Sequence, residues 1–234
     1  MIIGGFQRFS LIDYPDRICA VVFTQGCNFR CPYCHNPELV RIRRKRPVPN
    51  GLKEKEILSF LDRRKGRLDA LTVTGGEPLL QSGLENFLSA VKGLGYLVKL
   101  DTNGSFPSGL ERIIQSGSID YIAMDIKTSL DKYEYVIKKG IEKTKILDSI
   151  RLIMDSGLDY EFRTTVVPSY DGFERDDFYK IGQLIKDSRL YVLQRFVPSK
   201  ALDDQFLDMR GCSDEEIDSH KEIMEGFVQR CVVR

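Results

Sequence analysis

The feature that most constrains the fold is a regular alternation of short apolar runs with helical patterns. Runs rich in β-branched and apolar residues are typical of buried strands and cover 18–24, 70–74, 96–100, 121–126, 160–167 and 191–197. Apolar residues recur at helical spacing in 54–61, 84–91, 110–114, 146–154, 178–185 and 217–228. Strands that alternate with helices form parallel sheets. The pattern therefore predicts about six β-α units, arranged either as a doubly wound sheet or as a partial barrel.

Length and charge limit the remaining possibilities. The chain has 234 residues, which predicts a single domain with a core at 18–198 and a C-terminal helix near 213–230. The 35 basic and 34 acidic residues give a net charge of +1, so no global charge favours nucleic acid or a membrane surface. Neither a signal-like start nor an apolar run of membrane-spanning length occurs in the sequence, and we expect a cytoplasmic protein.

Three of the six cysteines crowd into eight positions directly after the first predicted strand. Cys27, Cys31 and Cys34 leave that strand on a short loop, where their thiolates can converge. In a reducing compartment such a group indicates metal or redox chemistry rather than disulfides. An iron-sulfur cluster with three protein ligands keeps one iron open for catalysis. The isolated Cys19, Cys212 and Cys231 are expected to be packing residues.

Two other interpretations of the cysteines remain open at this point. A zinc site would use His35 or Cys19 as its fourth ligand, although adjacent residues such as Cys34 and His35 seldom bind one tetrahedral ion. Alternatively, Cys31-Pro32-Tyr33-Cys34 resembles the dithiol motif of glutaredoxins, which predicts a thiol-disulfide oxidoreductase. That second interpretation gives Cys27 no purpose.

Polar or glycine-rich turns follow the next three predicted strands. They contain Gly75, Gly76 and Glu77, then Asp101, then Asp125 and Lys127. Sheets of this class place their sites at the carboxyl ends of strands. Each residue alone also has an ordinary explanation as a turn former or surface charge, and the same holds for Arg163 and Thr164 near the end of the fifth strand.

The spacing Cys27-x-x-x-Cys31-x-x-Cys34, with Tyr33 before the last cysteine, resembles the signature of the radical S-adenosylmethionine (SAM) superfamily. The wider stretch 23–38, ending in Cys34-His35-Asn36, resembles the activating enzymes of glycyl-radical proteins. The opening residues 4–7 and 10–15 are similar to the branch that activates anaerobic ribonucleoside-triphosphate reductase. The resemblance covers about residues 3–198.

This resemblance implies a partial (β/α)6 TIM-like barrel of the radical SAM type. It implies one [4Fe-4S] cluster on the catalytic residues Cys27, Cys31 and Cys34, with SAM on the open iron. The oxidoreductase reaction would cleave SAM reductively to a 5′-deoxyadenosyl radical. That radical would install a glycyl radical on a partner such as anaerobic ribonucleotide reductase, with reduced flavodoxin or ferredoxin as electron donor. A radical SAM enzyme acting on a small molecule is the alternative within the superfamily.

The resemblance also assigns expected contacts to SAM. Tyr33 belongs to the cluster motif, and Gly75-Gly76-Glu77 resembles the family's GGE motif, whose backbone and acid hold the methionine amino group. Asp101 resembles a second contact to that amino group. Asp125 and Lys127 resemble contacts to the ribose and to the methionine carboxylate, respectively.

The chain departs from the better-known pyruvate formate-lyase activating enzymes in two places. Those enzymes have a histidine after the last barrel strand, where this chain offers Gln194, and a glycine-rich turn where it has residues 14–17. It also lacks a cysteine-rich insert, so a single cluster is expected. The basic run Arg41, Arg43, Arg44, Lys45 and Arg46 is hypothesised to dock an acidic electron donor or the protein substrate.

Overall fold

The computed structural model describes residues 1–41 and 53–234, and these form two compact units whose segments interleave along the chain. Unit 1 comprises Met1–Asn28, Glu38–Thr102 and Phe106–Ile122, and unit 2 comprises Phe29–Pro37, Asn103–Ser105 and Ala123–Arg234. Of the basic run proposed as a docking site, all but Arg41 lies outside the described residues. No helix in the described ranges is long and apolar enough to cross a membrane.

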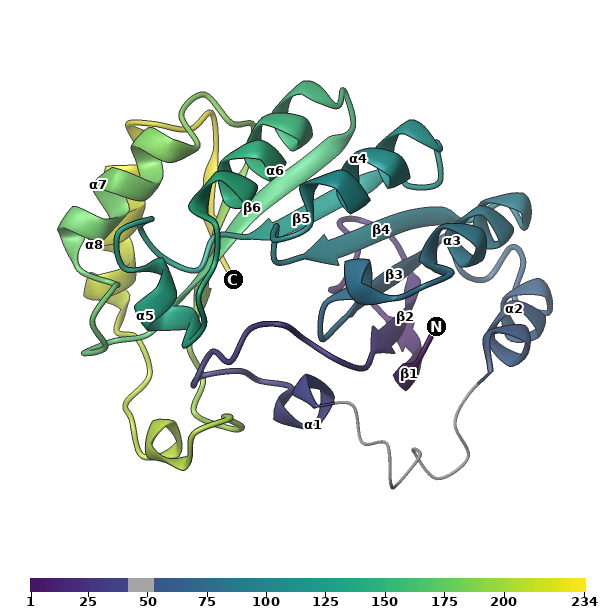
Figure 1. Ribbon diagram of the computed structural model, residues 1–234, viewed down its shortest axis with the longest axis horizontal. Helices are drawn as coiled ribbons and strands as arrows, with labels where there is room; N and C mark the ends of the chain where they lie inside the picture. The colour runs from purple at the N-terminus through teal and green to yellow at the C-terminus, as the bar shows by residue number, and fades with distance from the viewer. Residues whose placement is uncertain (42–52) are drawn as a thin grey trace. The chain divides into compact units, whose positions relative to one another are not determined.

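Unit 1 is built on four strands, β1 (Ile3–Ser10), β2 (Cys19–Thr24), β3 (Ala70–Gly75) and β4 (Leu97–Thr102). β1 pairs antiparallel with β2, whereas β2, β3 and β4 pair in parallel in that order. Its helices are α1 (Pro37–Val40), α2 (Glu54–Asp62), α3 (Leu84–Gly93) and α4 (Pro107–Gln115), with a 3-10 turn η1 (Pro78–Leu80) after β3 (Figure 1). The interior residues of β2 and β3 are almost fully buried, as expected of central parallel strands.

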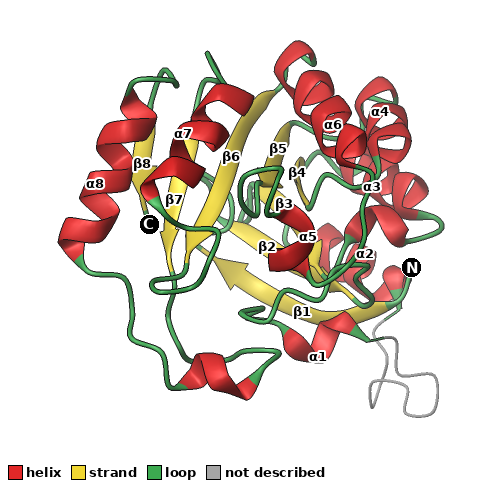
Figure 2. Cartoon of the chain, turned by 60° about the vertical axis from the view of Figure 1, so that its left-hand side comes forward, coloured by secondary structure: helices red, strands yellow, loops and turns green. Residues whose placement is uncertain are grey.

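Unit 2 contains the parallel strands β6 (Asp159–Val166), β7 (Tyr191–Arg195) and β8 (Cys231–Val233). Its helices are α5 (Tyr133–Ile137), α6 (Lys143–Asp155), α7 (Arg175–Leu184) and α8 (Asp214–Glu225), with a 3-10 turn η2 (Asp204–Leu207) (Figure 2). β5 (Tyr121–Asp125) begins in unit 1 and ends in unit 2. Strands thus alternate with helices in both units, as the apolar pattern predicts.

All of the predicted strands and helices are present, with ends shifted by a few residues. Among the described residues, two strands and two short α-helices were missed: β1, β8, α1 and α5. β1 has two glycines after its first residue, Ile3, and exposes much of its length, so it lacks the apolar run of a central strand. The sequence of α5, Tyr-Glu-Tyr-Val-Ile, is rich in residues that favour strands. The expected single domain stays a prediction.

Candidate active site

The loop after β2 carries Cys27 and is fixed by backbone hydrogen bonds to α1. Gly26 N–H donates to the Leu39 carbonyl at 2.7 Å, and Cys27 N–H donates to the Val40 carbonyl at 3.1 Å. Gly26 has φ 103°, a conformation that glycine adopts without a steric cost. The half-buried Cys27 therefore leaves β2 on a backbone that is held in place.

The Gly75-Gly76 turn at the end of β3 contacts this same loop, backbone against backbone. Gly76 N–H donates to the Thr24 carbonyl at 2.9 Å, and Glu77 N–H donates to the Gly26 carbonyl at 2.8 Å. A Cβ on Gly76 would lie 2.1 Å from the Gly26 oxygen and 3.2 Å from the Cys27 nitrogen. Only glycine permits this approach. Unit 1 therefore brings Gly75 and Gly76 together with Cys27.

The carboxylate of Glu77 is fully buried and joins the ends of two strands. Its Oε1 accepts hydrogen bonds from Leu79 N–H at 3.1 Å and from the Thr102 hydroxyl at 2.8 Å. The first bond caps η1 and the second reaches the last residue of β4. These bonds fix the direction of the Gly75-Gly76 turn. The expected contact of the acid with the methionine amino group stays a prediction.

Asp101 at the end of β4 forms a buried ion pair with a residue that the sequence analysis missed. Lys99 Nζ lies 2.7 Å from Asp101 Oδ1, and both side chains are nearly inaccessible to solvent. Residues i and i+2 of a strand share a face, so this pair lies on one side of β4. A lysine two positions before a strand-end acid was the signal that could have revealed it.

The second half of the cysteine loop belongs to unit 2 and is held by two segments. Cys34 N–H donates to the Cys31 carbonyl at 3.2 Å, which closes a tight turn. Arg30 N–H donates to the Ile137 carbonyl of α5 at 2.8 Å. On the other side, the N–H groups of 202 and 203 donate to the Pro32 carbonyl at 2.9 and 3.0 Å. Cys31 and Cys34 thus project from a braced turn.

Tyr33 lies between these two cysteines in an aromatic cluster. Its ring centroid is 5.8 Å from that of Phe173, 6.3 Å from Phe206 and 6.4 Å from Tyr170. The side chain is buried. Burial raises the pKa of the Tyr33 phenol well above its usual value, and the neighbouring Cys31 acts in the same direction. Tyr33 is therefore a neutral aromatic wall beside the cysteine turn.

Asp125 and Lys127, at the end of β5, form an ion-pair group with Arg163 of β6. Lys127 Nζ is 2.8 Å from Asp125 Oδ2, and Arg163 Nε is 2.9 Å from Asp125 Oδ1. Burial alone would raise the pKa of Asp125, but Arg163 and Lys127 together hold it well below its usual value. Against the opposing effect of burial, Asp125 and then Cys31 raise the pKa of Lys127 well above its usual value. The ammonium of Lys127 thus acts electrostatically on Cys31.

A second pair of charges, missed in the sequence, continues this group. Arg163 Nη1 is 3.8 Å from Glu161 Oε1, and the fully buried Glu161 binds Arg234 at 2.9 and 3.0 Å. Arg163 therefore lies between two carboxylates, which fixes its side chain. The predicted residue Thr164 has a structural role, since its hydroxyl donates to the Ile126 carbonyl at 2.7 Å.

The end of β7 carries no histidine of its own, but an imidazole lies there. His35 stacks on Phe196 with centroids 5.8 Å apart and planes inclined by 15°. Burial lowers the pKa of His35, whereas a hydrogen bond to the Val197 backbone opposes this shift. Gln194, the expected substitute, accepts instead from the Thr165 hydroxyl at 3.5 Å.

The fourth ligands considered for zinc are engaged elsewhere. His35 packs on Phe196, as described. Cys19 is fully buried inside β2, where it accepts a hydrogen bond from the Thr72 hydroxyl at 3.8 Å. No disulfide forms among the six cysteines, all of which are described.

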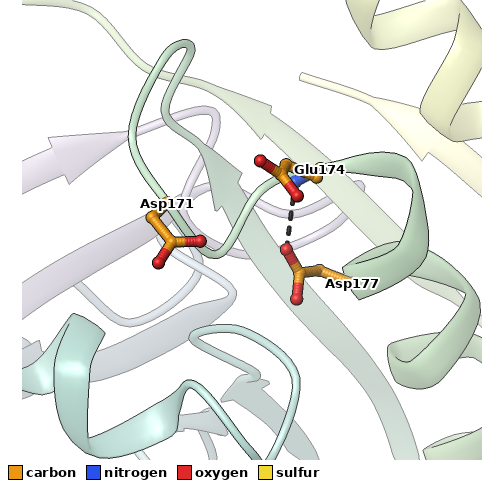
Figure 3. Close-up of side chains that lie close together, drawn as sticks. All are labelled: Asp171, Glu174 and Asp177. Atoms are coloured by element: carbon orange, nitrogen blue, oxygen red, sulfur yellow. Dashed lines mark hydrogen bonds between the residues drawn. The ribbon is translucent and has the colours of Figure 1, made fainter.

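Three carboxylates near the start of α7 also lie close together: Asp171, Glu174 and Asp177 (Figure 3). A lysine ammonium already provides the positive charge. Lys132 Nζ is 2.7 Å from Asp171, 3.0 Å from Asp177 and 3.7 Å from Glu174. Figure 3 also shows the bond from Glu174 N–H to Asp177, at 3.1 Å, that caps α7. This group of charges links the loop that carries Asp171 to the start of α7.

The surroundings of Cys27 in unit 1, and of Cys31 and Cys34 in unit 2, are suited to the ligation of an iron-sulfur cluster. Thiolates are the usual ligands of such clusters, and Cys27, Cys31 and Cys34 all sit on loop backbone that is held by hydrogen bonds. The Lys127 ammonium, which acts on Cys31, lowers the cost of holding thiolate charge. The Gly76 turn leaves the backbone beside Cys27 unobstructed by any side chain of its own.

Comparison with known proteins gives a consistent result. Residues 21–185 match the Radical SAM superfamily. The whole chain is 35% identical to 95% of a Methanocaldococcus jannaschii protein, MJ1227, named provisionally as a glycyl-radical enzyme activating enzyme. It is 33% identical, over 76% of its length and 73% of the relative's, to a pyruvate formate-lyase-activating enzyme of Staphylococcus aureus.

Solved structures agree on the fold. SuiB of Streptococcus suis, bound to S-adenosylmethionine, superposes with a TM-score of 0.67 at 13% identity, covering 92% of this chain and 49% of SuiB. At that identity the likeness concerns the fold alone, and it confirms the expected α/β partial barrel of the radical SAM type. The thiol-disulfide oxidoreductase alternative gains no support from these matches.

Proposed function

The chain belongs to the radical SAM superfamily, in its branch of glycyl-radical enzyme activating enzymes, and from this premise we propose that it installs a glycyl radical on a partner enzyme. The partner that the sequence favours is anaerobic ribonucleoside-triphosphate reductase. Support for this choice comes from residues 4–7 and 10–15, which resemble the activating proteins of that reductase. Reduced flavodoxin or ferredoxin is the proposed electron donor.

The residues that would hold the cofactors have distinct tasks. Cys27, Cys31 and Cys34 would ligate three irons of a [4Fe-4S] cluster, and SAM would bind the fourth. When bound, this pair supplies an electron and a 5′-deoxyadenosyl radical able to abstract a glycine hydrogen. The Gly75-Gly76 backbone would approach the methionine part of SAM, since it has no side chain in the way.

The charged residues at the strand ends would orient SAM. Lys127 stays protonated and suits the methionine carboxylate, whereas the ionised Asp125 suits the hydroxyls of the ribose. Asp101, held by Lys99, would accept from the methionine amino group. Tyr33 would border the cofactor with its aromatic ring. Because these side chains are already held by ion pairs and packing, little of their freedom would be lost when SAM binds.

One observation carries this assignment: the Lys127 ammonium, which lies 2.8 Å from the Asp125 carboxylate, acts electrostatically on Cys31. SAM carries both hydroxyl groups and a carboxylate. Its binding therefore requires a carboxylate such as Asp125 and an ammonium such as Lys127 near a cysteine that binds the cluster.

The test is anaerobic reconstitution with iron and sulfide, followed by addition of SAM and dithionite. We expect about four irons per chain and formation of 5′-deoxyadenosine and methionine. Cys34→Ala should lose both the cluster and the products, whereas Cys212→Ala is the matched control and should retain them. An intact cluster that yields no 5′-deoxyadenosine would refute the proposal.

The partner is tested separately by electron paramagnetic resonance. Anaerobic ribonucleotide reductase incubated with the loaded enzyme should develop a glycyl-radical signal, and pyruvate formate-lyase serves as the comparison. A signal on pyruvate formate-lyase alone would change the partner and leave the activity standing. Products of SAM cleavage without a signal on either protein would favour the small-molecule alternative.

A further inference from the structure

Helix α5 packs directly against the cysteine loop of unit 2. The Ile137 carbonyl at the end of this helix accepts the Arg30 N–H bond described above. The buried Tyr133 ring meets the Phe29 ring edge-on, with centroids 6.3 Å apart. One face of α5 therefore backs the loop that carries Cys31, and its other face is available to solvent.

Aromatic rings lead from the cysteine turn to that outer face. Tyr33 lies next to Tyr170, with centroids 6.4 Å apart, and Tyr170 stacks on Tyr135 at 5.5 Å with planes inclined by 25°. Tyr135 is 46% exposed. The pKa of Tyr170 is raised by burial, then by the Tyr135 phenol and by Cys31. A molecule resting on Tyr135 is thus two rings from the cysteine turn.

The rim of this surface is positively charged. α5 ends at Lys138, whose backbone adopts the left-handed conformation with φ 52°, and Lys138 Nζ lies 3.9 Å from the Tyr135 centroid. Lys138 and Lys139 are exposed, and neither forms an ion pair with any described residue. Residues 132–145 contain five lysines against two glutamates. We name the surface formed by Tyr135, Lys138 and Lys139 the α5 patch.

We propose that the α5 patch docks a small acidic electron-donor protein of the flavodoxin class. Exposed lysines that form no ion pair attract a partner of opposite charge and orient it. An exposed aromatic ring at the centre of a charged rim is typical of an interaction surface. In the docked complex the flavin hydroquinone would lose one electron and become the semiquinone, and the cluster would gain that electron.

This inference rests on the proposed function, because the electron needs a cluster on the cysteine loop. The separate hypothesis for the basic run from Arg41 to Arg46 stays a prediction, because all of that run but Arg41 lies outside the described residues. Packing connects the α5 patch with the cysteine turn. A donor bound there would lie close to its acceptor without having to displace SAM-binding side chains.

The test compares two double variants that change the charge equally. Lys138→Glu with Lys139→Glu alters the patch, whereas Lys186→Glu with Arg230→Glu is the control. The control residues are exposed and precede β7 and β8, whereas α5 follows the end of β5. Binding of oxidised flavodoxin is measured by calorimetry on cluster-free and reconstituted protein, and reduction by flavodoxin hydroquinone is followed by stopped flow.

We expect the patch variant to bind flavodoxin about tenfold more weakly at low salt and to be reduced correspondingly more slowly. The difference should vanish at about 0.5 M salt, where surface charges are screened. The control variant should behave as the wild type. Lys138→Gly with Lys139→Gln removes the two charges, and glycine adopts the left-handed backbone at 138 without strain. This variant should show an intermediate effect, which would distinguish the loss of charge from misfolding.

Dithionite separates this proposal from the function on which it rests. With dithionite all variants should form 5′-deoxyadenosine at the wild-type rate, because a small reductant needs no docking surface. If the wild type fails with dithionite, the proposed function fails, whereas the calorimetry still decides the docking. Wild-type flavodoxin binding by the patch variant would overturn the docking proposal. So would a patch variant that flavodoxin reduces normally but that no longer forms a glycyl radical on its partner.

Discussion

Replacing Gly76 with alanine should destabilise the protein and prevent it from holding a cluster. The added Cβ would lie 2.1 Å from the Gly26 oxygen and 2.6 Å from the Gly26 carbonyl carbon, whereas ordinary contacts begin at 3.4 Å. The β3 turn and the cysteine loop must therefore separate by on the order of 1 Å. Overpacking of this kind costs about 1–3 kcal/mol. Loss of the bond between Glu77 N–H and Gly26 adds about 1 kcal/mol.

The expected loss of unfolding free energy is thus about 2–4 kcal/mol, measured by urea denaturation of the cluster-free protein. The matched control is Gly93→Ala. Gly93 is the last residue of α3, and a Cβ there would meet no atom within 4 Å. Alanine at this position should stabilise the helix by up to about 1 kcal/mol.

Cluster loading gives the second measurement. All three cysteine ligands remain in Gly76→Ala, but the backbone that positions Cys27 is displaced, so iron and sulfide per chain should fall well below the wild-type value. Gly93→Ala should load normally. If Gly76→Ala has wild-type stability and a full cluster, the backbone contact between the β3 turn and the cysteine loop does not have the importance that its geometry indicates.

Three further predictions concern charged groups. Asp125→Asn leaves Lys127 and Arg163 without the carboxylate between them and should cost on the order of 2 kcal/mol of stability, with weaker SAM binding by calorimetry; unchanged binding would contradict its assigned role. His220, buried and stacked on Phe178 at 3.9 Å, has its pKa lowered by burial to about 4. As the pH falls from about 6.5 to 4, the unfolded chain therefore binds more protons than the folded chain, and up to about 3 kcal/mol of unfolding free energy should be lost. Urea denaturation at several pH values should show this loss in the wild type and not in His220→Phe. Lys132→Ala should cost on the order of 2 kcal/mol because it removes the ammonium that neutralises the buried Asp177. The exposed pairs of Lys180 should contribute less than about 1 kcal/mol when tested by Lys180→Ala.

The elements predicted from the sequence are those with strong periodicity. The runs of buried strands and the apolar faces of helices such as α3 and α6 need only local information, and both elements are present within a few residues of their predicted ends. β1 was missed because an antiparallel strand with one exposed face lacks a continuous apolar run. α5 was missed because its packing against the cysteine loop, rather than its intrinsic propensity, makes it helical.

The site residues were predicted from turns and motifs, whereas their partners were not. Cys27, Gly76 and Asp101 each stand at the end of a predicted strand, where position along the chain already indicates a role. Glu161 and Arg234 are 73 residues apart in sequence, and only the folded order β6-β7-β8 brings them together. The placement of His35 at the end of β7 likewise depends on contacts between distant segments.

One pattern in these pairings was available from the sequence. Asp101 and Asp125 each have a lysine two residues away, and both lysines bind the acid at 2.7–2.8 Å. Because residues i and i+2 of an extended chain share a face, a strand-end acid with such a lysine is paired before any ligand arrives. A carboxylate has about four acceptor positions, so one lysine occupies only part of it. The lysine then fixes the direction of the acid without consuming its capacity to bind. In a chain with such a cysteine motif, a strand-end acid that has a lysine two residues away should therefore be an acid that orients a bound ligand. The spacing distinguishes it from an ordinary surface charge.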